Sequence, residues 1–301
     1  MNRYNNCRLC PRKCGVNRAK NTGVCNSSDK CYIVRAALHF WEEPCISGEK
    51  GSGTIFFAGC NLGCVFCQNH EISDGKSKYG VEVTTDRLVE IFFELKEKGA
   101  NNINFVTPTH YIPHIKEAII KARQRGFELP FVYNTSGYEN VESIKELDGL
   151  IDIYLPDMKY YDSELSFKYS KAKDYFEKVS EAIGEMVRQV GCSEFDENGM
   201  MKKGVIVRHM ILPAHTKDSK RIIEYLYSTY GDDIFLSIMN QYTPVQTERM
   251  RLYPELNRTI TKREYSRVID YAMELSVENA FIQEGETCKE SFIPTFDGEG
   301  C

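Results

Sequence analysis

The sequence lacks the long hydrophobic runs of membrane-spanning proteins, the dense basic runs of many nucleic-acid-binding proteins and the apolar leader of secreted proteins. No apolar run approaches the roughly 18 residues that a membrane-spanning helix needs, and the polar N-terminus, MNRYNNCRLCPRKC, lacks the apolar core of a signal peptide. The 301-residue chain carries 38 basic and 43 acidic side chains, which argues against broad binding to nucleic acids. These absences predict a soluble, cytoplasmic protein that binds neither membranes nor nucleic acids.

The distribution of cysteine is the unusual feature of the composition. Nine of the twelve cysteines fall within the first 67 residues. Disulfide scaffolds are short secreted chains with about 8–10% cysteine, and this chain is neither short nor predicted to be secreted. In a reducing compartment, thiols clustered at short spacings are typical of metal ligands. We therefore expect metal binding in the N-terminal part of the chain.

The composition of the chain changes at about residue 50. Residues 1–50 are rich in cysteine, arginine, lysine and asparagine but poor in aliphatic residues, so this segment needs a metal or contacts with the rest of the protein to fold. Residues 51–301 alternate short apolar runs with amphipathic stretches. We predict a small cysteine-rich, metal-binding appendage over 1–50 and an α/β domain over 51–301.

Six short runs rich in Ile, Val, Phe or Tyr predict strands, because a Gly, a Pro or a polar break follows each of them. They span 54–58, 102–106, 131–134, 151–155, 204–212 and 234–239, with a further short run at 281–283. Apolar residues at helical spacing predict helices over 85–98, 111–124, 141–147, 163–190, 219–229 and 262–275. Six βα units imply a parallel sheet with right-handed crossovers. A doubly wound sheet and a partial barrel both satisfy this pattern.

The loop directly after the first predicted strand carries the most specific signal. It reads Cys60-Asn-Leu-Gly-Cys64-Val-Phe-Cys67, with three thiols at C-x3-C-x2-C spacing. Three thiolates can hold three irons of a [4Fe–4S] cluster and leave the fourth iron open to a substrate or cofactor. Gly59 and Gly63 let the backbone turn around a bulky cluster. A zinc site or incidental buried thiols are the alternatives, but a structural zinc usually takes four ligands in paired C-x2-C knuckles.

This loop, with Phe66 directly before its last cysteine, resembles the signature of the radical S-adenosylmethionine (SAM) superfamily. The resemblance implies a partial (β/α)6 TIM-like barrel and a catalytic [4Fe–4S] cluster on Cys60, Cys64 and Cys67. It also implies that SAM binds the open iron, with Phe66 near the adenine. The reduced cluster then cleaves SAM to methionine and a 5′-deoxyadenosyl radical, which abstracts hydrogen from a substrate.

Residues 53–290, and Phe57-Ala-Gly-Cys-Asn-Leu-Gly-Cys-Val-Phe-Cys-Gln-Asn69 in particular, are similar to proteins related to pyruvate formate-lyase activating enzyme, in a branch with a cysteine-rich N-terminus. The resemblance implies an oxidoreductase that takes electrons from a donor such as flavodoxin or ferredoxin. Its substrate would be a glycine of a glycyl-radical enzyme, or alternatively a peptide or small metabolite. A non-catalytic metal-binding recognition module is the alternative from another class.

Polar residues at the other strand ends are candidates for holding SAM, because catalytic residues collect at the C-terminal mouth of such barrels. The candidates are Thr109, Asn134, Ser136, Asp157, Lys159, Arg208 and Gln241. Asp157 and Lys159 belong to Pro-Asp-Met-Lys, which is similar to the Asp-Leu-Lys that lies against SAM in the activating enzyme. Where the superfamily usually has Gly-Gly-Glu, this chain has Thr107-Pro108-Thr109, so threonine hydroxyls and carbonyls would receive the SAM ammonium group.

A second group of cysteines lies near the N-terminus. Cys7, Cys10, Cys14 and Cys25 offer four thiols within 19 residues. This number suffices for a structural zinc or for a fully ligated auxiliary [4Fe–4S] cluster, and thiolates suit both metals. Disulfides are the alternative. Five basic side chains lie among these cysteines, and we interpret them as a solvated positive face: Arg8, Arg12, Lys13, Arg18 and Lys20.

Overall fold

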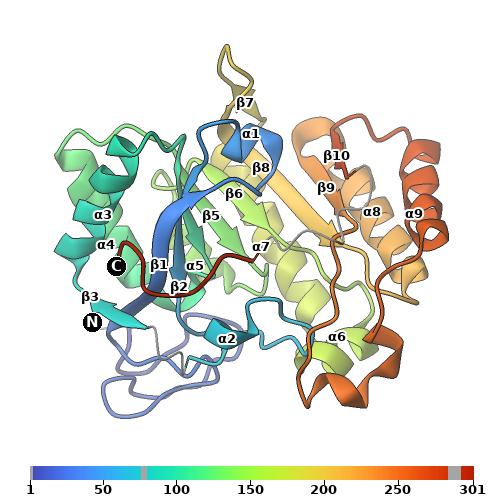
Figure 1. The fold of residues 1–301 in the computed structure, drawn as a ribbon, viewed down its shortest axis with the longest axis horizontal. Helices are drawn as coiled ribbons and strands as arrows, with labels where there is room; N and C mark the ends of the chain where they lie inside the picture. The colour runs from blue at the N-terminus through green and yellow to red at the C-terminus, as the bar shows by residue number, and fades with distance from the viewer. Residues whose placement is uncertain (1–2, 76–79, 284–292) are drawn as a thin grey trace.

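A parallel sheet that does not close into a full barrel forms the centre of the molecule (Figure 1). The computed structural model describes residues 3–75, 80–283 and 293–301. Seven of the described strands run parallel, in the spatial order β2-β4-β5-β6-β8-β9-β10. They are β2 (Ser52–Phe57), β4 (Ile103–Val106), β5 (Phe131–Thr135), β6 (Ile153–Pro156), β8 (Met201–Met210), β9 (Phe235–Met239) and β10 (Ala280–Ile282). All six strands predicted for the barrel are present, and so is the short strand after them.

Two antiparallel strands that the sequence analysis did not predict extend one side of this sheet. Strand β1 (Cys31–His39) pairs with β2, and β3 (Val81–Val83) pairs with β1. The side chains of β1 do not alternate between apolar and polar, because both faces of the strand are covered. Helix α3 (Thr85–Glu97) packs on one face, and Phe296 of the C-terminal segment packs beside Val34 on the other. Part of the segment predicted as an appendage is therefore an integral strand of the main sheet.

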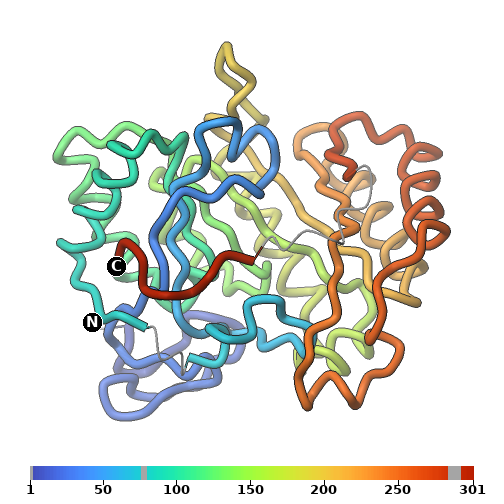
Figure 2. The backbone as a smooth tube through the Cα atoms, viewed as in Figure 1, coloured from blue at the N-terminus to red at the C-terminus, as the bar shows by residue number. Residues whose placement is uncertain are grey.

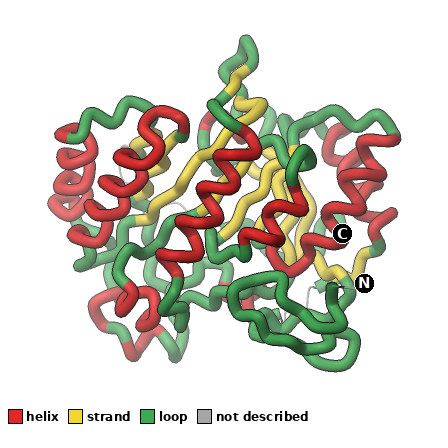
Figure 3. The backbone as a smooth tube through the Cα atoms, turned by 180° about the vertical axis from the view of Figure 1, so that it is seen from behind, coloured by secondary structure: helices red, strands yellow, loops and turns green. Residues whose placement is uncertain are grey.

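Helices cover the outer face of the sheet, as the view from behind shows (Figure 3). Besides α3, the βα units contribute α4 (Ile112–Gln124), α5 (Val141–Ile144), α7 (Tyr175–Val190), α8 (Thr216–Tyr230) and α9 (Lys262–Glu274). The shorter elements are α1 (Pro44–Ser47), α2 (His70–Ser73), α6 (Ser163–Ser170) and β7 (Glu194–Phe195), which pairs antiparallel with β8. Among the helices of the described residues, none has both the length and the apolar character that crossing a bilayer requires.

The stretch 163–190, predicted as one helix, forms two. Helix α6 ends at Ser170 because Lys171 adopts the left-handed conformation, with φ at 52°, which a continuing helix cannot contain. Helix α7 starts only at Tyr175. The break turns the end of α6 toward the cysteine loop, where Val65 N donates to Tyr169 O at 2.9 Å.

Alternating side chains give the sheet an apolar outer face and a partly polar inner face. On β4, Phe105 points toward the helices and stacks on Phe131 of β5 at 5.7 Å, whereas Asn104 points inward and hydrogen-bonds Glu42. Ile46 of α1 packs on inner-face residues of the central strands and closes the N-terminal end of the barrel. The space at the C-terminal ends of the strands is left for the site.

Residues 3–30 form loops and turns that pack at the C-terminal ends of the strands (Figure 2). The hydroxyl of Tyr4 hydrogen-bonds His114 Nδ1 at 2.7 Å, which ties this segment to α4. Ser143 of α5 donates to the carbonyl of Leu9 at 2.8 Å. The segment is therefore docked on the barrel through two of its helices.

Candidate functional site

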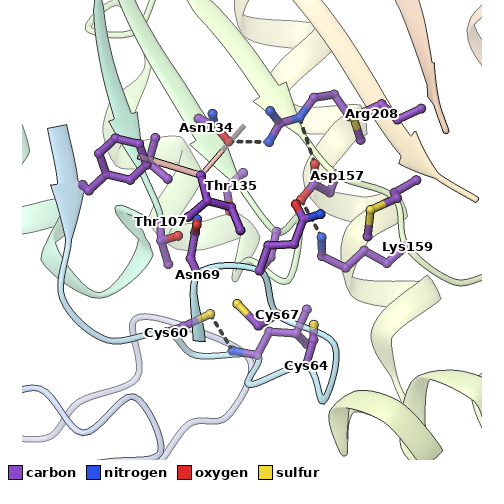
Figure 4. A pocket seen from close by; sticks show the side chains of 18 of the residues that line it. Cys60, Cys64, Cys67, Asn69, Thr107, Asn134, Thr135, Asp157, Lys159 and Arg208 are labelled. Atoms are coloured by element: carbon purple, nitrogen blue, oxygen red, sulfur yellow. Dashed lines mark hydrogen bonds and ion pairs between the residues drawn. The ribbon is translucent and has the colours of Figure 1, made fainter. Parts of the chain in front are cut away.

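A cavity of about 210 Å³ lies at the C-terminal ends of the parallel strands (Figure 4). It brings together ten of the residues predicted for the site: Cys60, Cys64, Phe66, Cys67, Asn134, Ser136, Asp157, Lys159, Arg208 and Gln241. The cysteine loop forms one wall of the cavity, and the charged side chains of Asp157 and Lys159, which follow β6, and of Arg208 on β8 lie opposite (Figure 4). Ten of the eleven residues predicted to hold the cluster and SAM therefore line one cavity.

A glycine directs the cysteine loop into the cavity. Gly59 follows β2 with φ at 89°, a conformation that side chains rarely adopt. A Cβ at this position would lie 2.6 Å from the Cys25 carbonyl oxygen and 2.5 Å from Ser27 Oγ, both in the N-terminal segment. Only glycine therefore allows the loop to turn while the N-terminal segment packs against it.

The three thiols of the loop are held by few hydrogen bonds. Leu62 N donates to Cys60 Sγ at 3.4 Å, and Ser170 Oγ donates to Cys64 Sγ at 3.1 Å. Burial raises the pKa of Cys60 above its ordinary value and raises the pKa of Cys67 to about 12. The raised pKa values favour the protonated thiols. A bound metal would instead favour the thiolates, because a coordinating thiol is deprotonated.

Phe66 forms an aromatic wall of the cavity next to Cys67. It is 3% exposed, and its ring centroid lies 6.0 Å from that of Tyr242, 6.3 Å from that of Tyr160 and 6.4 Å from that of Tyr169. All three contacts are edge-on, the geometry that aromatic pairs favour. The phenyl ring is therefore held in one orientation at the cavity wall.

Three charged side chains form a network across the cavity. Asp157 Oδ2 accepts from Lys159 Nζ at 2.6 Å, and Asp157 Oδ1 accepts from Arg208 Nε at 2.9 Å (Figure 4). Burial opposes ionisation of Asp157, but the charges of Arg208 and then Lys159 outweigh it, so the pKa of Asp157 is lowered. The pKa of Lys159 is raised, because the attraction of Asp157 outweighs the effect of burial. All three groups are therefore charged at neutral pH.

Glu42 completes this network, although the sequence analysis did not single it out. Its Oε2 lies 3.0 Å from Arg208 Nη1, and its Oε1 accepts from Asn104 at 3.0 Å and from Asn134 at 3.1 Å. Burial raises the pKa of Glu42 against the opposing charge of Arg208. Arg208 also donates to Asn134 Oδ1 at 2.6 Å. The connection between β1 and α1 therefore supplies a carboxyl group to the cavity.

Thr109 does not lie where the sequence predicted it. Its hydroxyl donates to the buried Glu139 at 2.5 Å, and it is not among the residues that line the cavity. Thr107 lines the cavity instead, with φ at 59°, which is uncommon for a β-branched residue. Its N–H donates to Asn134 O at 2.9 Å, which holds this conformation. Sequence position alone did not distinguish the two threonines.

The cavity also contains residues that the sequence analysis did not single out. They are His39, Trp41, Phe56, Leu62, Gln68, Asn69, Val106, Thr135, Met210, Met239, Ile293 and Pro294. Most are common residue types in apolar runs or loops, so only the fold identifies them. Leu62, Gln68 and Asn69 belong to the extended cysteine-loop motif and are the three that the motif could have indicated.

The segment that carries the N-terminal cysteines packs against the cysteine loop. Cys7, Cys10 and Cys25 are buried, and Cys14 is half-buried. Burial, together with the nearby Cys25 and Cys14 thiols, raises the pKa of Cys10 to about 12. In residues 3–75, 80–283 and 293–301, no three His, Cys, Asp or Glu side chains already stand at metal-binding distances. The ligand role of these cysteines stays a prediction.

Two of the five basic side chains near these cysteines bind backbone carbonyls, which corrects their interpretation as a common solvated face. Arg18 is 1% exposed and donates to the carbonyls of Ser27 and His110. Arg12 donates to four backbone carbonyls. Both guanidinium groups therefore hold backbone in place.

Comparisons with known proteins identify the superfamily of this chain. Residues 54–226, more than half of the chain, match the family model of the Radical SAM superfamily, and the chain belongs to that superfamily. It is similar to the uncharacterised protein MJ0674 of Methanocaldococcus jannaschii, with 29% identity over 286 residues that cover 92% of this chain and 77% of that protein. As a member of the superfamily, the protein uses a [4Fe–4S] cluster and SAM.

One solved structure shows a similar fold, and a second superposes less closely. SuiB of Streptococcus suis bound to S-adenosylmethionine superposes with a TM-score of 0.50 and 16% identity, over 75% of this chain and 48% of that one. A domain of the pyruvate-formate lyase-activating enzyme of Bacteroides vulgatus superposes with a TM-score of 0.43 and 14% identity, over 62% of this chain and 100% of that domain. The chain spans about half the length of SuiB.

Proposed function

We propose that Cys60, Cys64 and Cys67 hold the catalytic [4Fe–4S] cluster and that SAM binds beside it in the same cavity. The observation that carries this proposal is that the three thiols line one cavity with the Asp157–Lys159–Arg208 network. Three thiolates leave one iron of the cluster free for the amino and carboxylate groups of SAM. When bound, the reduced cluster supplies the electron that cleaves SAM, and the radical so formed removes hydrogen from the substrate.

Several polar groups of the cavity fit a ligand with a carboxylate and hydroxyl groups. Ser136 Oγ is buried at the cavity and has no hydrogen-bond partner among the described residues. A buried hydroxyl without a partner is costly, so this group fits a bound ligand. Lys159 lies at the cavity with its ammonium group fixed by Asp157, and it can attract the SAM carboxylate. Thr107 and Gln241 offer further donors and acceptors.

The remaining walls of the cavity are apolar and favour the exclusion of water. Phe66, Met210 and Met239 line the cavity beside the polar groups. A dry cavity strengthens the electrostatic interactions within it and protects reactive intermediates from side reactions. We propose that this apolar lining has that role when the cofactors are bound.

We propose a glycine of a glycyl-radical enzyme as the substrate, and a peptide or small metabolite as the alternative. Trp41 lines the cavity while it is 53% exposed, so its indole spans the interior and the surface. An aromatic side chain in this position suits contact with a polypeptide at the cavity mouth. We further propose that a flavodoxin or ferredoxin reduces the cluster.

Isotope transfer tests the proposed substrate class. The reconstituted, reduced protein is incubated with SAM and a glycyl-radical enzyme that carries α-deuterated glycine. Deuterium in the 5′-deoxyadenosine supports the proposal. Formation of 5′-deoxyadenosine without deuterium, together with modification of a peptide or metabolite, supports the alternative.

A further inference from the structure

Arg12 lies in the N-terminal segment between Cys10 and Cys14, and its guanidinium group binds the loop that carries the three catalytic cysteines. Its Nε donates to the carbonyl of Asn61 at 3.0 Å, and its Nη2 donates to the carbonyl of Leu62 at 3.1 Å. Both carbonyls belong to the three-residue stretch between Cys60 and Cys64. The side chain thus holds the backbone next to the thiols.

The same guanidinium group binds the end of α6. Its Nη2 donates to the carbonyl of Ser170 at 2.8 Å, and its Nη1 donates to the carbonyl of Lys171. The hydroxyl of Ser170 in turn donates to Cys64 Sγ at 3.1 Å. Arg12 therefore fixes the residue that hydrogen-bonds one catalytic thiol as well as the backbone beside another.

The surroundings of Arg12 keep it in this position. The guanidinium carbon lies 5.1 Å from the centre of the Tyr138 ring, and the carbonyl of Tyr138 accepts from Asn61 Nδ2 at 2.6 Å. Lys13 N donates to Cys10 O at 3.0 Å, which closes the tight turn that carries Arg12. The geometry of this turn, and hence the place of Arg12, depends on the segment that contains Cys10 and Cys14.

We propose that Arg12 is a positioning residue that couples the N-terminal cysteine site to the catalytic cluster. This inference rests on the proposed function, in which Cys60, Cys64 and Cys67 hold that cluster. Arginine suits the role because its planar group offers five donors in a fixed fork, whereas lysine offers a single point charge. Hydrogen bonds to ligating sulfurs help to set the reduction potential of an iron–sulfur cluster. A displaced Ser170 is therefore expected to change both the retention and the potential of the cluster.

Two substitutions of Arg12 and a matched control test this role. Arg12→Ala removes the fork, Arg12→Lys keeps only the charge, and Arg8→Ala removes the same charge from an exposed position between Cys7 and Cys10. We expect both Arg12 variants to assemble the cluster but to lose iron to a chelator about tenfold faster, as the loss of a hydrogen bond to a charged group predicts. We also expect a shifted midpoint potential in a titration followed by electron paramagnetic resonance. Arg8→Ala should behave as the wild type.

A double-substitution cycle tests the coupling itself. Cys10→Ser with Cys14→Ser should accelerate iron loss from the catalytic cluster, and the addition of Arg12→Ala should cause little further change, because the three substitutions remove one interaction. Arg12 variants with the wild-type rate and potential would overturn the positioning role, and additive effects would overturn the coupling. A wild-type protein that assembles no cluster would contradict the proposed function. This result is distinct from the outcomes that overturn the positioning role or the coupling.

Discussion

Glu42 Oε2 lies 3.0 Å from Arg208 Nη1, although 166 positions separate the two residues in the chain. Arg208 directs its other nitrogens at Asp157 and Asn134, so all three arms of its guanidinium group are occupied. The network thus holds the Arg208 guanidinium group in one orientation. Charged groups that are already oriented need not reorganise when a ligand binds, which favours both affinity and catalysis.

Replacement of Glu42 should weaken this network. Glu42→Gln removes the carboxyl partner of the partly buried Arg208, so we expect the free energy of unfolding to fall by about 1–3 kcal/mol. The affinity for SAM should fall as well, because Arg208 gains freedom to move. Denaturant unfolding and calorimetric titration with SAM measure the two effects. Glu49→Gln, at an exposed position after α1, is the control. If Glu42→Gln and Glu49→Gln have the same stability and the same affinity for SAM, the contact between Glu42 and Arg208 contributes to neither property.

Loss of Asp157 or Lys159 should reduce SAM affinity more than cluster assembly. Each substitution to alanine removes charge-assisted hydrogen bonds that orient the cavity, a loss of about 1.5–3 kcal/mol, or roughly ten- to a hundredfold in affinity. Iron content should stay near the wild-type value because neither residue is a proposed ligand. Lys145→Ala, an exposed lysine paired with Glu142, serves as the control. If both alanine variants bind SAM with wild-type affinity, Asp157 and Lys159 form only a local ion pair that does not contribute to SAM binding.

The stability of the protein should fall in mild acid, in part because of His209. This residue of β8 is 4% exposed, its Nδ1 hydrogen-bonds the carbonyl of Met158 at 2.8 Å, and burial lowers its pKa to about 4. The folded state therefore favours neutral histidine, and its contribution is present above pH 6.5 and is lost as the pH falls toward 4. The thermal midpoint should decline less over this window in His209→Asn, which keeps a donor for Met158 O. The same decline in both proteins would contradict this contribution.

Metal analysis of a protein without the catalytic thiols should identify the N-terminal site. In the variant with Cys60, Cys64 and Cys67 all replaced by alanine, about four irons per chain would indicate an auxiliary cluster, and about one zinc would indicate a zinc site. Removal of Cys7, Cys10, Cys14 and Cys25 should lower stability, because their segment has little core of its own. Absence of both metals from the catalytic-loop variant would reject the N-terminal site.

The predictable features of this protein are those encoded in short stretches of sequence. The strands follow from runs of β-branched and aromatic residues, and the cysteine loop follows from its own spacing. The features that were missed depend on contacts between distant segments. Glu42 and Arg12 acquire their roles only through partners on other elements. The break at Lys171 interrupts a continuous helical pattern because the end of α6 binds Arg12 and approaches Cys64.

The cleavage of SAM by the reconstituted protein tests the central claim most directly. Wild-type protein and the Cys60, Cys64 and Cys67 triple alanine variant are reduced in the presence of SAM, and 5′-deoxyadenosine is measured. We expect the wild type to form it and the variant to form none, since no other thiol of the loop can replace a ligand. The exposed Cys192, replaced by alanine, provides the control and should leave the product unchanged. Wild-type amounts of 5′-deoxyadenosine from the triple variant would contradict the proposed cluster site.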